Sequence, residues 1–173
     1  MRWVLAALLV AAAGDALAAD VKVGVVNIPR LLQEAPQADA ARKRLESDFA
    51  PRDQKIVELQ KKLKKSEEKL AKDAAIMSDS QRQSRERELI ALKRDIKRAK
   101  EEFNEDLNLR RNEELAKLQK LVYDTIVALA KEQKYDAILG DSVLYASDRV
   151  DLTDMVLSRL RKESGAGAGS GGR

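Results

Sequence analysis

The chain has 173 residues, of which 36% are charged and only 3% aromatic, with a formal net charge of +4 and neither Cys nor His. This composition favours long solvated helices over a large packed core, and the mild positive charge favours acidic partners or anionic surfaces. The lack of Cys and His excludes thiol nucleophiles, Cys/His zinc sites and histidine acid–base catalysis, so neither a cofactor nor an enzymatic activity is expected.

The first 18 residues have the pattern of a secretory signal peptide. Arg2 provides a positive start, residues 3–13 form a short apolar run, and an Ala-Leu-Ala motif at residues 16–18 has small residues where a signal peptidase reads. The apolar run is too short to span a bilayer. We therefore expect residues 1–18 to be cleaved on export. The alternative interpretation is an N-terminal amphipathic helix.

The segment after this leader predicts a strand followed by a short helix. Residues 21–27 are mostly β-branched and at first alternate between apolar and polar side chains, which indicates a strand. Pro29 suits the first turn of a helix, and a short helix is expected over residues 30–35. Pro36 then separates this helix from the long helical region.

The central region, residues 37–134, predicts two long antiparallel helices. It is almost free of Gly and Pro, and apolar residues recur every three or four positions on both sides of a break at residues 77–80. This is the single apolar stripe of a coiled coil. At the break, Ser78 and Gln81 have the spacing of a capping box for the return helix. We therefore expect a hairpin that protrudes as an arm.

Two irregularities interrupt the apolar stripe of this hairpin. Pro51 lies inside the first helix, where a proline removes a backbone hydrogen bond, so a bend is expected near residues 49–52. In the return helix the spacing slips to fours between Phe103 and Leu115, which resembles a stutter in a coiled coil. Leu115 is expected to begin a second buried stretch of the stripe.

The helical period ends after the arm, and shorter elements follow. Residues 135–139 and 143–146 are strand candidates on either side of a Gly-Asp-Ser turn. A last amphipathic helix is predicted over residues 152–160, with Asp148 or Asp151 as its cap.

The segments that flank the arm, residues 19–36 and 135–163, are expected to form one small β-rich body, which makes the fold class α+β. A body of about 55–60 residues is marginal as an independent core, and short sheets leave edges open to pairing. We therefore expect obligate homo-oligomerisation through the strands. Residues 164–173, rich in Gly, Ala and Ser, are expected to be disordered. The body residues expected at the interface are Val23, Val25, Ile138, Leu139, Val143 and Tyr145.

In its order of parts the chain resembles the Skp/OmpH family of periplasmic chaperones. The resemblance rests on the leader, the strand at residues 21–27, the charged hairpin with its Arg-Arg-Asn-Glu-Glu-Leu-Ala-Lys-Leu segment at 110–118, and residues 136–139 and 150–157. It implies a periplasmic trimer, in which strands of three copies form a small β-barrel and three arms surround a cavity. It further implies that this cavity holds unfolded outer-membrane β-barrel proteins without ATP, and that basic residues contact lipopolysaccharide.

Exposed residues of the arm are the candidates for these contacts. Because acidic residues are interleaved with the basic ones, the favoured interpretation of the basic run is a solvated helix face, and contact with an anionic partner is the alternative. The apolar residues expected to face an unfolded client protein are Ile76, Met77, Ile90 and Ala91. The residues expected to face lipopolysaccharide or an anionic membrane surface are Arg85, Arg87, Lys93, Arg94, Lys97 and Arg98.

A structural coiled-coil spacer or tether of the cell envelope shares every periodicity signal and is the alternative function. A tether usually needs an anchor, and the sequence predicts neither a lipid-attachment Cys nor a membrane span. The adjacent acid pairs at residues 67–68 and 101–102 do not share a helix face, so they are interpreted as solvated rather than catalytic. Nucleic acid is not expected as a partner, because stacking aromatic residues are scarce.

Overall fold

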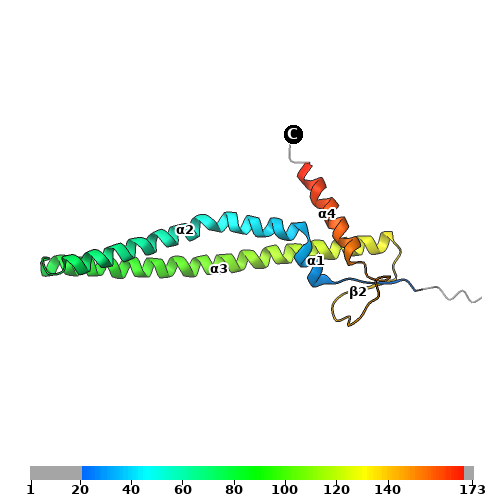
Figure 1. The fold of residues 1–173 in the computed structure, drawn as a ribbon, viewed down its shortest axis with the longest axis horizontal. Helices are drawn as coiled ribbons and strands as arrows, with labels where there is room; N and C mark the ends of the chain where they lie inside the picture. Colours follow the sequence, from blue (N-terminus) through cyan, green and yellow to red (C-terminus); the bar gives the residue numbers. More distant parts are fainter. Residues whose placement is uncertain (1–20, 170–173) are drawn as a thin grey trace, which may run out of the picture.

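The computed structural model describes residues 21–169 and contains a long helical arm attached to a small body (Figure 1). The predicted signal peptide, residues 1–18, lies outside the described residues. Residues 21–169 hold no helix whose apolar stretch could cross a lipid bilayer. In chain order the elements are β1 (Val23–Val25), α1 (Ile28–Glu34), α2 (Pro36–Asp73), α3 (Asp79–Glu132), β2 (Ala137–Leu139) and α4 (Thr153–Gly169).

The arm consists of α2 and α3, which run antiparallel and side by side (Figure 1). With 38 residues in α2, the shorter helix is about 57 Å long at 1.5 Å per residue. The predicted capping box is confirmed at the far end: Ser78 Oγ accepts a hydrogen bond from the Gln81 N–H, and Gln81 Oε1 accepts one from the Ser78 N–H. These two bonds satisfy donors that the first turn of α3 would otherwise leave free, so the reversal is set locally.

The predicted bend lies where α2 passes Pro51. The helix continues through the proline, and Figure 1 shows that α2 arches instead of running straight beside α3. A proline inside a helix is a usual cause of such curvature. Phe49 is buried and packs edge-on against Phe103 of α3, with ring centroids 5.6 Å apart. This contact holds the two helices together next to the arch.

The sheet of the body has two parallel strands, with Val23 opposite Ala137 and Val25 opposite Leu139. The expectation of a third strand over residues 143–146 is wrong, because this segment has no regular structure. The other edge of β1 pairs instead with the chain just before α4: the Val25 N–H donates to Val150 O, and the Leu152 N–H donates to Val25 O, each at 2.8 Å. The only edge that β1 had left is therefore occupied.

A buried polar junction joins the end of β1 to the start of α4. The Thr153 side chain is fully buried, and its hydroxyl accepts a hydrogen bond from the Asn27 N–H at 2.9 Å and donates to Asp151 Oδ1. The same Asp151 oxygen accepts the Thr153 N–H at 2.8 Å, so of the two expected caps it is Asp151 that serves α4. Hydrogen bonds from Thr153 also hold the pKa of Asp151 below its ordinary value.

The core of the body forms where α4 packs against α1 and the base of the arm. Burial of the apolar side chains at its centre stabilises the body through the hydrophobic effect. The helix α4 continues to Gly169, so the expectation that residues 164–169 are disordered is wrong. Once buried residues nucleate a helix, further turns are added at low cost. The fully buried large side chains include Leu31, Val122, Val156, Leu157 and Leu160.

Candidate functional site

An uncovered apolar loop projects from the body. Of the residues predicted at the oligomer interface, Val23, Val25 and Ile138 are half-buried, whereas the remaining three are exposed. Leu144 is fully exposed as well, and sequence reasoning missed it although it lies inside the expected third strand. We call the exposed set, Leu139, Val143, Leu144 and Tyr145, the body patch.

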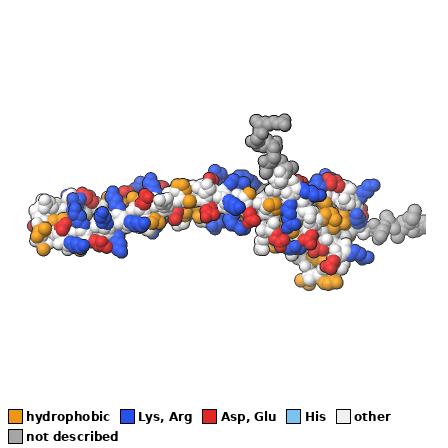
Figure 2. All heavy atoms as spheres, turned by 45° about the horizontal axis from the view of Figure 1, so that its top comes forward, with side chains coloured by type: hydrophobic (Ala, Val, Ile, Leu, Met, Phe, Trp, Pro, Cys, Tyr) orange, Lys and Arg blue, Asp and Glu red, His pale blue; other side chains and the backbone are white. Residues whose placement is uncertain are grey.

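The body patch lies beside an open strand edge. Within the part of the chain that the structure describes, β2 pairs with β1 alone, so its other edge has no strand partner. A hollow of about 360 Å³ separates the loop of residues 140–146 from β1, and apolar side chains lie at the end of this projecting loop (Figure 2). An open edge next to exposed large apolar side chains is a surface typical of protein association.

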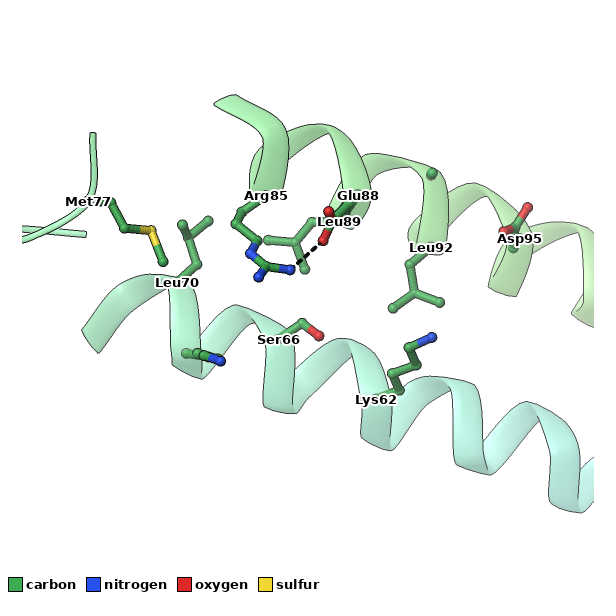
Figure 3. A pocket seen from close by; sticks show the side chains of 11 residues that line it. Lys62, Ser66, Leu70, Met77, Arg85, Glu88, Leu89, Leu92 and Asp95 are labelled. Atoms are coloured by element: carbon green, nitrogen blue, oxygen red, sulfur yellow. Dashed lines mark hydrogen bonds and ion pairs between the residues drawn. The ribbon is translucent and has the colours of Figure 1, made fainter. Parts of the chain in front are cut away.

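The far end of the arm contains a second uncovered apolar region. Ile76 at the turn is 86% exposed, and Ile90 on α3 is 55% exposed. Met77 and Ala91 line a groove of about 360 Å³ between α2 and α3, which we call the tip groove (Figure 3). The structure therefore brings together two of the four predicted client-facing residues, and places Ile76 and Ile90 outside the groove.

The predicted lipid-facing residues divide into paired and unpaired cations. Arg87 and Arg94 are in no ion pair within residues 21–169 and, being seven residues apart, share one face of α3. The other four lie within ion-pair distance of acidic residues, so each pair as a whole carries no net charge. These pairs are Arg85–Glu88 at 2.8 Å, Lys93–Glu67 at 2.7 Å, Lys97–Glu101 at 3.8 Å and Arg98–Asp95 at 3.7 Å.

Positive charge is concentrated in the far half of the arm. Residues 55–100 contain 15 Lys and Arg against 8 Asp and Glu, a surplus of seven, whereas the whole chain has a surplus of only four. The rest of the molecule is therefore slightly acidic, and Figure 2 shows blue side chains along the whole arm, including its far half. A localised positive field of this kind accelerates the approach of anionic partners. Within residues 21–169, no group of acidic residues is arranged to hold a metal ion.

Near the body, a charged cluster replaces part of the apolar seam. The expectation that Leu115 returns to the buried stripe is wrong, because its side chain is 44% exposed. The shift in spacing turns the preceding residue, Glu114, toward α2, where it accepts hydrogen bonds from Lys117 Nζ at 2.7 Å and Arg44 Nη2 at 2.8 Å. These two bonds, that from Lys117 first, lower the pKa of Glu114 from 4.5 to about 2.

Replacing Glu114 with Gln is expected to remove part of the acid sensitivity of the fold. A folded-state pKa below the unfolded value means that the carboxylate stabilises the protein above pH 4.5, and that this contribution is lost as the pH falls toward about 2. The difference in the free energy of unfolding between the wild type and Glu114→Gln should therefore be largest at neutral pH and shrink in acid. Urea titrations at pH 7 and pH 3 measure it.

A suitable control for this experiment is Glu101→Gln, which alters an exposed carboxylate that pairs with Lys97 within one helix. It should change stability little at either pH, because exposed pairs of this kind contribute little. An equal difference between wild type and Glu114→Gln at pH 7 and at pH 3 would contradict the assignment.

Comparisons with known proteins give a consistent result. The family model described as "Outer membrane protein (OmpH-like)" matches residues 22–160. The "Chaperone protein Skp" of Pectobacterium atrosepticum is 29% identical over 164 residues, which cover 92% of this chain and 99% of that protein. The "Chaperone protein Skp" of Escherichia coli strain K12 is 30% identical over 163 residues, again with 92% and 99% coverage.

A solved structure supports the fold independently. The crystal structure of an OmpH-like protein from Caulobacter crescentus superposes with a TM-score of 0.75 and covers 82% of this chain and 85% of that one. At 16% sequence identity this similarity concerns the fold alone. The long helical hairpin on a small body, together with a family match that spans most of the chain, shows that this protein belongs to the Skp/OmpH family.

Proposed function

We propose that the protein is an ATP-independent holdase chaperone of the periplasm, which binds unfolded outer-membrane β-barrel proteins between helical arms and prevents their aggregation. The curated relatives are named Skp chaperones, and the chain spans 99% of the length of both proteins described above. The proposal thus extends to this chain the chaperone role stated in the names of relatives of similar length.

One observation carries the proposal: the far end of the arm combines exposed apolar side chains with a surplus of positive charge. Ile76 and Ile90 are exposed there, beside the partly open tip groove. Weak apolar contacts suit an unfolded chain, which offers no fixed shape to recognise, and Met77 adapts to varied partners. The positive field speeds capture and favours acidic clients.

The holdase cavity requires several arms, and the body patch is the surface we assign to assembly. We propose a trimer, as the family resemblance implies, in which the body patch and the open edge of β2 are covered by neighbouring copies. Covering exposed residues such as Leu144 and Tyr145 would remove apolar surface from water and contribute to association.

Contact with lipopolysaccharide or an anionic membrane surface belongs to the same proposal. Arg87 and Arg94 are the residues best suited to it, because they share a helix face and the described residues provide no acidic partner for either. Each guanidinium group can donate two parallel hydrogen bonds to the oxygens of one phosphate group.

Diluting an urea-unfolded outer-membrane β-barrel protein into buffer with the purified mature chain, without nucleotide, is expected to suppress the light scattering of aggregates. The double variant L144K/Y145K should shift the mass measured by multi-angle light scattering toward a single chain and should lose most of this protection, because charge on the body patch opposes assembly. Y123K is the matched control, since Tyr123 is similarly exposed on α3 but lies outside the patch.

Two outcomes would overturn the proposal in different ways. Wild-type protein in excess that gives no protection would exclude the holdase activity and favour the alternative of a structural spacer. A wild-type assembly that protects, but whose mass is unchanged in L144K/Y145K, would instead place the subunit interface elsewhere.

A further inference from the structure

The tip groove is an underfilled stretch of the seam between α2 and α3. Ser66 stands at a position of the apolar stripe, three and four residues from leucines, and its short side chain points into the groove (Figure 3). Leu70 of α2 and Leu89 and Leu92 of α3 line the groove and stay half-buried, whereas Ile96, nearer the body, is buried. Apolar surface thus stays accessible where a larger residue in place of Ser66 would have covered it.

The α2 wall of the groove carries two lysines that form no ion pair within the described part of the chain. Lys62 and Lys69 line this wall, and neither is in an ion pair within residues 21–169. They are seven residues apart, which places their Cα atoms about 10.5 Å apart along one helix face. On the α3 wall, Arg85 is paired with Glu88, and Asp95 lies 3.7 Å from an arginine of the same helix.

We propose that the tip groove binds short extended segments of client polypeptide in which apolar and acidic residues alternate. This inference rests on the proposed holdase function and assigns a specific recognition site to it. In an extended segment, every second side chain faces the same way, so apolar side chains can contact Leu70, Leu89 and Leu92. The acidic side chains between them lie at the rim, where the long stems of Lys62 and Lys69 bring ammonium groups to them.

The charges of the groove favour a polypeptide over an anionic lipid. Glu88 and Asp95 belong to the α3 side of the lining, so they would repel a headgroup with several phosphates that fills the groove. In a peptide the acidic side chains are spaced apart and can all lie toward the lysines of α2. A polypeptide also has backbone N–H groups, which can donate hydrogen bonds to the carboxylates of Glu88 and Asp95, and side-chain carboxylates that can pair with the lysines. The mixed rim is therefore complementary to a peptide that carries both donors and acidic groups.

The test is the binding of two labelled ten-residue peptides to the intact wild-type assembly, measured by fluorescence anisotropy. One peptide alternates Glu and Phe, and the other has Lys in place of each Glu. The acidic peptide is expected to bind about tenfold more tightly, because its charge complements the α2 wall. In an NMR spectrum of the assembly, the methyl signals of Leu70, Met77, Leu89 and Leu92 should shift on binding.

Two variants address the groove directly, and both are expected to keep the fold intact because neither removes a buried side chain. S66L restores an apolar stripe residue with a better helix propensity, so it should raise the melting temperature while weakening acidic-peptide binding about tenfold by filling the groove. K62E/K69E should weaken binding at least about tenfold through charge reversal. The matched control K61E/K64E makes the same charge change on exposed lysines of α2 that do not line the groove, and should change binding less than about twofold.

If K61E/K64E and K62E/K69E weaken peptide binding equally, the proposal is wrong, because the effect would then come from the overall positive charge of the arm and not from the groove. Unchanged peptide binding in S66L would also overturn the proposal. Binding of phosphatidylglycerol vesicles that S66L and K62E/K69E abolish, without any effect on the peptide, would assign the groove to lipid instead. Aggregation assays separate this inference from the holdase function. If the wild type prevents aggregation but peptide binding does not depend on the groove, the groove is not the recognition site, and the holdase function still holds.

Discussion

Replacing Leu157 with Ala is expected to lower the free energy of unfolding by about 2–5 kcal/mol, the largest effect of any single change considered for this chain. Leu157 is fully buried at the centre of the body, within the cluster that α4 forms with α1 and the base of the arm. Truncating it removes the transfer free energy of its methyl groups and leaves a cavity that a small body can close only in part. The measurement is urea unfolding followed by circular dichroism at one fixed protein concentration, because oligomerisation makes apparent stability depend on concentration.

Leu115 provides a matched control for this experiment. The same Leu→Ala change at a side chain that is 44% exposed is expected to cost less than about 1 kcal/mol, because little apolar surface is lost from a packed environment. The periodicity of the sequence assigns both leucines to buried stripes, so the contrast between them tests the structure rather than the pattern. Equal losses for L157A and L115A would mean that α3 faces the other way near residue 115.

Replacing Gly24 with Ala is expected to destabilise the body by about 1–3 kcal/mol, the range usual for overpacking a filled core. The reason is space and not backbone conformation, since no described glycine has a positive φ angle. A Cβ atom at Gly24 would lie 3.0 Å from Leu152 Cγ, closer still to Leu152 Cδ1, and 3.3 Å from Tyr135 Cε1. Leu152 is itself buried, so it cannot turn away without disturbing the core.

Gly165 offers the same substitution where nothing opposes it. A Cβ atom there would meet no other atom within 4 Å, and alanine in the interior of a helix is favoured over glycine by up to about 1 kcal/mol. G165A should therefore leave the thermal midpoint unchanged or raise it, whereas G24A lowers it. A drop in the midpoint of G165A equal to that of G24A would show that the loss reflects a general intolerance of Gly→Ala changes and not the contacts of Gly24.

The arm could be derived from the sequence because its causes are local. An apolar residue every three or four positions specifies a helix with one buried face, and the capping box at Ser78 and Gln81 specifies where the second helix begins. Which of Glu114 and Leu115 faces the seam between the helices could not be derived in this way. It depends on where Arg44 of α2 lies across the hairpin, because this distant side chain provides a hydrogen-bond partner for an inward-facing Glu114.

The structures of residues 143–146 and of the end of α4 could not be derived from local sequence either. The apolar composition of 143–146 predicts a strand, but a strand forms only by pairing with a neighbour. The edges of β1 are taken by β2 and by residues 150–152, and the loop does not pair with the open edge of β2. Residues 164–169 have the composition of a linker, but they continue a helix whose preceding turns are buried. In both cases the outcome depends on which elements are already packed nearby.

The sequence by itself determined the helical hairpin, its point of reversal, the small body and the family resemblance, because these follow from periodicity, from local hydrogen bonding and from the order of the parts. Only the tertiary structure decided which apolar residues stay uncovered: the body patch around Leu144, and the tip groove where Ser66 interrupts a stripe of leucines. Whether a side chain is exposed depends on how two segments that are distant in the sequence pack together. A sequence pattern specifies which face of each helix is apolar, but not how closely the two helices approach each other.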